Sequence, residues 1–102
     1  YYTWDYHYNL GRAYYLSGQI DKAIESLEQA RTRNENALPI RLHLAASYAR
    51  AGRIDDAEWE VEEIQTLNPE ETISLLKTTI PFNDPQYMQM FVSDLRKAGL
   101  PE

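Results

Sequence analysis

The chain has 102 residues, 43% of them hydrophobic, which is enough for one domain with a shared core and too few for two independent domains. Its formal net charge of -6 opposes binding to a phosphate backbone, so we expect no nucleic-acid partner. The absence of cysteine excludes disulfides and thiolate chemistry, and no apolar run approaches the roughly 20 residues that span a bilayer. We expect no membrane contact and a cytoplasmic location, with the periplasm as the alternative that a cysteine-free chain leaves open.

The start of the chain is unusually aromatic for a terminus, because free termini are normally polar and frayed. The aromatic residues are Tyr1, Tyr2, Trp4, Tyr6 and Tyr8. We therefore interpret the chain as the C-terminal fragment of a longer protein. The same aromatic face is a candidate surface for self-association of the isolated fragment.

An internal repeat of 34 residues follows. Residues 4–37 align with residues 38–71 without a gap, and nine of the 34 pairs are identical, where average residue usage gives roughly two by chance. The identical pairs include Leu10 with Leu44, Tyr14 with Tyr48, Gly18 with Gly52, Asp21 with Asp55 and Ala23 with Ala57. The two copies predict the same local structure.

Each copy has the pattern of a helix, a turn and a second helix. Gly18 and Gly52 suit the positive φ that ends a helix, and we expect Asp21 and Asp55 to cap the helices that follow. A small residue such as Ala23 lets two antiparallel helices approach closely. The sequence therefore predicts an all-α fold of two antiparallel helical hairpins.

The repeat resembles the tetratricopeptide repeat family. The resemblance rests on Leu10, Gly11, Tyr14, Ala23 and Leu27 in the first copy and on Leu44, Ala45, Tyr48, Ala57, Val61, Asn68 and Pro69 in the second. It implies a short right-handed superhelix, with repeat 1 at about residues 4–37 and repeat 2 at about 38–71. Together with residues 72–102 these repeats are expected to form a single domain.

We expect residues 72–102 to form a C-terminal helical cap. Asn68 and Pro69 predict the start of a short helix, residues 80–83 a loop, and Asp84 with Pro85 the start of a last helix that ends near Gly99. In this last helix one apolar face consists of Met88, Phe91, Val92 and Leu95, and Gln86, Gln89, Asp94, Arg96 and Lys97 are expected to face water. Such a helix can cover the apolar side of the last hairpin, including Val61 and Ile64.

Residues 81–85 and 95–102 resemble the C-terminal ends of bacterial class III adenylate/guanylate cyclase-like proteins, in which repeats of this kind follow the catalytic region. The resemblance implies that the parent of this chain is a signalling protein of that type. None of the metal- or nucleotide-binding residues of the cyclase lies in these 102 positions, so no catalysis is carried over.

The chain offers little to an enzyme. His7 and His43 have no i, i+4 partner for a metal, and no phosphate-binding loop or nucleophile motif is present. The acidic residues from Asp55 to Glu63, including Glu60, are expected to form a solvated helix face rather than an acid and base pair. We predict no catalytic residue, no metal site and no cofactor.

The candidate partner-binding groove lies on the first helix of each hairpin. In the family that the chain resembles, this stripe lines a concave face that receives a peptide or a partner helix. Here the stripe consists of Tyr8, Arg12, Tyr15, Leu42, Ala46 and Ala49. We therefore expect a protein-interaction or scaffolding module that positions upstream domains by binding protein. The alternative is a purely structural or homo-oligomerisation module, in which Tyr8 and Tyr15 pack on a preceding repeat.

Overall fold

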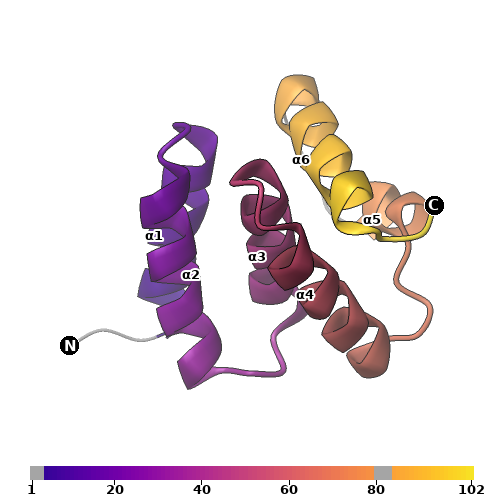
Figure 1. Ribbon diagram of the computed structural model, residues 1–102, viewed down its shortest axis with the longest axis horizontal. Helices are drawn as coiled ribbons and strands as arrows, with labels where there is room; N and C mark the ends of the chain where they lie inside the picture. The colour runs from indigo at the N-terminus through magenta and orange to yellow at the C-terminus, as the bar shows by residue number, and fades with distance from the viewer. Residues whose placement is uncertain (1–3, 80–83) are drawn as a thin grey trace.

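The computed structural model describes residues 4–79 and 84–102, which form six α-helices. The helices are α1 (Trp4–Leu16), α2 (Ile20–Arg33), α3 (Leu38–Arg50), α4 (Ile54–Leu67), α5 (Ile73–Thr79) and α6 (Pro85–Ala98). Figure 1 shows α1 and α2 as one hairpin, α3 and α4 as a second hairpin beside it, and α5 and α6 following the second hairpin. The predicted all-helical hairpin fold is confirmed. The predicted loop at residues 80–83 and the side chains of Tyr1 and Tyr2 lie outside the described residues.

The turns inside the two hairpins are built by glycine, as predicted. Gly18 has φ 83° and Gly52 has φ 81°, in the left-handed region that residues with a Cβ rarely adopt. The same backbone hydrogen bond follows each glycine: the Gln19 amide donates to the Tyr14 carbonyl at 2.9 Å, and the Arg53 amide donates to the Tyr48 carbonyl at 2.8 Å. These bonds satisfy carbonyl groups at the end of the first helix of each hairpin.

The prediction that Asp21 and Asp55 cap the second helices is wrong. The residues before the first helical positions are Gln19 and Arg53, and neither side chain makes a capping hydrogen bond. The two aspartates lie one position inside the helix, in its first turn. There a carboxylate still interacts favourably with the positive end of the helix dipole.

Small residues let α1 and α2 approach closely. Ala23 is fully buried, and a Cβ placed on Gly11 would lie 2.5 Å from Leu27 Cγ. Since no carbon side chain fits at that distance, Gly11 is needed for the close contact between the two helices. In the second hairpin Ala57 is likewise fully buried.

The C-terminal cap has the expected last helix but a different start. Asp84 caps α6 by accepting a 2.9 Å hydrogen bond from the Gln86 amide, and Gly99 ends it with φ 99°. Asn68, which was expected to open α5, instead ends α4. Helix α5 begins later, and the hydroxyl of Thr72 accepts the Leu75 amide at 3.1 Å.

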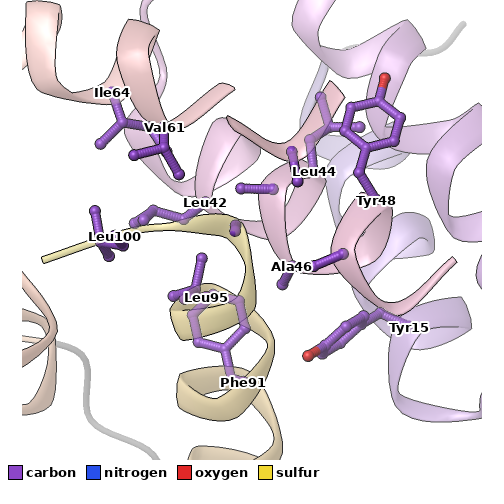
Figure 2. Packing of buried hydrophobic residues seen from close by; sticks show 14 of the residues in the cluster. Tyr15, Leu42, Leu44, Ala46, Tyr48, Val61, Ile64, Phe91, Leu95 and Leu100 are labelled. Atoms are coloured by element: carbon purple, nitrogen blue, oxygen red, sulfur yellow. The ribbon is translucent and has the colours of Figure 1, made fainter. Parts of the chain in front are cut away.

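Helix α6 completes the hydrophobic core. Phe91 and Leu95 are fully buried, as predicted, and α6 packs mainly on α3 and also touches α4. Figure 2 shows Leu100, just after α6, near Val61 and Ile64 of α4. The apolar side of the second hairpin is therefore covered by the cap, as predicted.

Candidate functional site

The six predicted groove residues lie on one side of α1 and α3, which we call the groove face. Tyr8 and Arg12 are half-buried. The other four are buried, namely Tyr15, Leu42, Ala46 and Ala49. Figure 2 shows Phe91 and Leu95 of α6 directed toward Leu42, Ala46 and Tyr15. The part of the groove face toward α3 is thus occupied by the chain's own last helix.

Helix α6 reaches from α1 to α4. Near its start, Tyr87 borders a depression of about 160 Å³ together with Leu16 of α1. Its middle packs on α3. At its end, Ala98 borders a second depression together with Val61 of α4. The helix therefore crosses α1 and α3, the two helices on which the groove was predicted, and continues to α4.

A buried carboxylate fixes α6 on the groove face. Asp94 is 2% exposed, and its Oδ2 accepts hydrogen bonds from the Tyr15 hydroxyl at 2.5 Å and from Arg50 Nε at 3.1 Å. The Arg50 guanidinium also lies 5.5 Å from the centre of the Tyr15 ring. Burial and the bond to Asp94 raise the pKa of Tyr15 above its usual range, so this hydroxyl stays a donor.

The prediction that Asp94 faces water is therefore wrong. The buried face of α6 is wider than the apolar pattern indicated, because Tyr87, Asp94 and Ala98 belong to it as well. Asp94 lies three residues after Phe91, which places the two side chains on adjacent parts of one helix face. Its burial is tolerated because the Tyr15 hydroxyl of α1 and Arg50 Nε of α3 both donate hydrogen bonds to Oδ2.

His43 forms the centre of an aromatic cluster between α3 and α6. Its Nδ1 lies 2.9 Å from the Pro39 carbonyl and its Nε2 lies 2.9 Å from the Tyr87 hydroxyl. The carbonyl can only accept, so Nδ1 carries the proton and Nε2 accepts from Tyr87. The ring stacks on Phe91, with centroids 4.5 Å apart and planes at 29°. Burial lowers the pKa of His43 to about 4, which keeps the imidazole neutral at neutral pH.

The part of the groove face nearest the start of α1 carries a second tyrosine and arginine pair. The Arg12 guanidinium lies 5.5 Å from the centre of the Tyr8 ring. Among the described residues Arg12 Nε is buried without a hydrogen-bond partner, while the Arg12 side chain as a whole is hydrogen-bonded to Tyr87 of α6. The Tyr8 ring meets His43 edge-on at 5.5 Å, so this pair adjoins the cluster that holds α6. Arg12 brings a positive charge to the groove face, whereas the charge of Arg50 is offset by its ion pair with Asp94.

A second buried carboxylate joins the two hairpins. Glu60 is fully buried and accepts hydrogen bonds from Arg31 Nη1 at 2.5 Å and from Arg41 Nη1 at 2.7 Å. The exposed Trp59 ring has both guanidinium groups 5.6–5.7 Å from its centre. The prediction that this acidic stretch is wholly solvated is wrong at Glu60. The sequence signal for the burial of Glu60 is its position three residues after Ala57, which places both side chains on the same face of the helix.

The side of the first hairpin away from α3 contains a hollow of about 480 Å³. Its lining residues are Tyr6, His7, Leu10, Tyr14, Lys22, Glu25, Ser26 and Gln29. Tyr6 is 45% exposed, and the Lys22 ammonium lies 5.7 Å from the centre of the Tyr14 ring. The hollow thus combines aromatic groups with both signs of charge.

Over residues 4–79 and 84–102, no three side chains of histidine, aspartate or glutamate gather where they could hold a metal ion. In the same part of the chain no helix has both the length and the apolar character of a membrane span.

The family comparison agrees with the fold. A family model described as tetratricopeptide repeat matches residues 14–80, which is more than half of the chain. The chain therefore belongs to the tetratricopeptide repeat family, whose repeats are typically non-catalytic modules for protein interaction and scaffolding. No curated protein and no solved structure gives a significant match. The matched range ends before residues 81–102, in which the resemblance to cyclase-like proteins lies.

Proposed function

We propose that this chain is a scaffolding module that positions upstream domains of a larger protein through the open side of its first hairpin. The observation that carries the proposal is the difference between the two ends of the repeat array. The second hairpin is covered by α6, whereas the first hairpin retains the hollow bordered by Tyr6, Leu10 and Tyr14. Repeat units bury such faces against a neighbour, so this is the side that takes a further contact.

The composition of the hollow fits a protein surface with mixed chemistry. Tyr6 and Tyr14 supply large rings with little conformational freedom to lose, and tyrosine is enriched at the centres of protein interfaces. Lys22 and Glu25 are exposed on one side of α2, so a partner with both charges can pair with them. We expect a helix of the upstream part of the same protein to lie there.

We further propose that the larger protein is a bacterial signalling protein of the nucleotide cyclase-like kind. The support is the resemblance of residues 81–85 and 95–102 to the ends of such proteins. In this proposal the repeats carry no part of the reaction and hold the catalytic region in place. The second candidate is a homo-oligomerisation module, favoured by the same exposed aromatic side of the first hairpin.

Lysine labelling tests the proposal, because the chain has three lysines and all are exposed. Lys22 borders the hollow, and Lys97 lies on the water-facing side of α6. Acetylation of the 102-residue chain and of the longer natural protein is followed by mass spectrometry. We expect Lys22 to react several-fold more slowly in the longer protein and Lys97 to react equally in both.

Equal reactivity of Lys22 in both proteins would contradict the proposal. Protection of Lys22 in the 102-residue chain alone, increasing with protein concentration, would instead support the homo-oligomerisation module. Replacing Tyr14 with serine should remove either kind of protection, because its ring lies beside Lys22.

A further inference from the structure

The hollow of the first hairpin has a counterpart in the second hairpin at the repeat spacing of 34 residues. Tyr14 and Ser26 line the hollow, and the residues 34 positions later are Tyr48 and Glu60. Both of these later residues are buried, and both form hydrogen bonds with side chains of α2. The second hairpin therefore shows which contacts this face makes when a helix lies on it.

A tyrosine, a carboxylate and a cation meet where α2 lies on the second hairpin. The Tyr48 hydroxyl donates a hydrogen bond to the Glu28 carboxylate of α2. The Arg53 guanidinium lies 4.7 Å from the centre of the Tyr48 ring and also interacts electrostatically with Glu28. Burial and the bond to Glu28 raise the pKa of Tyr48 above its usual range, so its hydroxyl stays a donor. A phenol and a cation of the second hairpin thus recognise a carboxylate of the neighbouring helix.

Two of these three groups are present in the hollow. Tyr14 stands at the repeat position of Tyr48, and the Lys22 ammonium lies 5.7 Å from the centre of the Tyr14 ring. Among the described residues, neither the Tyr14 hydroxyl nor the Lys22 ammonium makes a hydrogen bond or an ion pair. In the second hairpin the carboxylate comes from the neighbouring hairpin. At Tyr14 the carboxylate therefore has to come from a helix outside the two described hairpins.

The other polar contact of α2 with the second hairpin is not repeated in the hollow. Arg31 of α2 donates to Glu60, whereas the uncharged Ser26 stands at the repeat position of Glu60. Glu25 also lines the hollow, but it is exposed, and an exposed ion pair adds little to binding. The hollow therefore has donors for a carboxylate and has no buried carboxylate for an incoming cation.

We infer that the helix that docks in the hollow is acidic: an aspartate or glutamate on it accepts a hydrogen bond from the Tyr14 hydroxyl and pairs with Lys22. The occupant is the upstream helix of the same protein, so the inference rests on the proposed function and adds the chemistry by which that helix is recognised. Docking removes water from both groups, and a charge-assisted hydrogen bond offsets that loss. A basic residue at this place would instead meet Lys22 as a like charge.

Tyr14→Phe tests the inference, because it keeps the ring and removes the hydroxyl. Amide hydrogen exchange of α2 is measured for each variant in the 102-residue chain and in the longer natural protein. We expect Tyr14→Phe to speed this exchange about 10- to 100-fold in the longer protein, the ratio that corresponds to a hydrogen bond with a charged group, and to leave it unchanged in the 102-residue chain. Tyr8→Phe, on the same helix but outside the hollow, is the matched control and should have the same effect in both proteins.

Two neutralising changes in the hollow test the sign of the incoming charge. Lys22→Gln should speed exchange of α2 in the longer protein, whereas Glu25→Gln should leave it equal or slower. The opposite order would show that a basic helix docks there and would overturn the inference. If wild-type Lys22 is protected from acetylation in the longer protein but neither Tyr14→Phe nor Lys22→Gln changes the exchange, the inference is wrong and the proposed function stands. Equal acetylation of wild-type Lys22 in both proteins would contradict the proposed function, and the inference with it.

Discussion

Removing the carboxylate of Glu60 should destabilise the whole domain. Glu60 is fully buried, whereas the side chains of Arg31 and Arg41 are 25% and 10% exposed. Glu60→Ala leaves the partly buried guanidinium groups of Arg31 and Arg41 without the carboxylate that both of them bind. Breaking a buried ion pair costs about 3–5 kcal/mol, and we expect this range because two charged bonds are lost while Arg31 keeps some contact with water. The total stability of a domain of this size is roughly 5–15 kcal/mol.

Urea unfolding followed by circular dichroism measures the effect. With a slope of about 1–3 kcal/mol per molar urea, the midpoint should fall by at least about 1 M. Glu58→Ala is the control, because Glu58 is exposed on the same helix and should cost less than about 0.5 kcal/mol. Glu60→Gln keeps the volume and should lie between the two. Equal midpoints for Glu60→Ala and Glu58→Ala would refute the assignment of Glu60 as the link between the hairpins.

Three further predictions concern the core. Burial lowers the pKa of His43 to about 4 in the folded chain, against about 6.5 in the unfolded chain. The neutral imidazole therefore stabilises the fold fully above pH 6.5, and the free energy of unfolding falls by up to about 3 kcal/mol as the pH falls toward 4. Chemical unfolding between pH 5 and 7 should show this slope in the wild type and not in His43→Gln. Ser47 is fully buried and its hydroxyl has no partner among the described residues, so Ser47→Ala should raise stability by about 1 kcal/mol in urea unfolding, and a loss of stability would contradict this. Gly11→Ala should lower the melting temperature through a loss of about 1–3 kcal/mol, because its Cβ would overlap the buried Leu27, and an unchanged melting temperature would mean that Leu27 can move aside.

The repeats and their turns could be predicted from the sequence because their signals are local. Gly18 and Gly52 mark the turns 34 residues apart, and Asp84 and Gly99 mark both ends of α6. Each of these residues acts on backbone within a few positions of itself. Pattern reasoning therefore recovered the helices, their order and most of the buried face of α6.

The place of α6 on the groove face could not be predicted, because it depends on pairs far apart in sequence. Tyr15 and Asp94 are 79 residues apart, and an aspartate on an amphipathic helix is normally solvated. The hydrogen bond of Arg50 to Asp94 could not be predicted either, because these residues are 44 positions apart. The six groove residues lie on one face of α1 and α3, and their binding of a partner stays a prediction. What their positions could not reveal is that the chain itself supplies a helix to that face.

The most direct test of this arrangement is a double-mutant cycle between Tyr15 and Asp94. Tyr15→Phe, Asp94→Asn and the double variant are compared with the wild type by urea unfolding at neutral pH. If the Tyr15 hydroxyl binds the Asp94 carboxylate inside the domain, the two changes are coupled by about 1.5–3 kcal/mol, the value of a hydrogen bond to a charged group. If the two losses simply add within about 0.5 kcal/mol, the residues do not interact and α6 does not lie on the groove face.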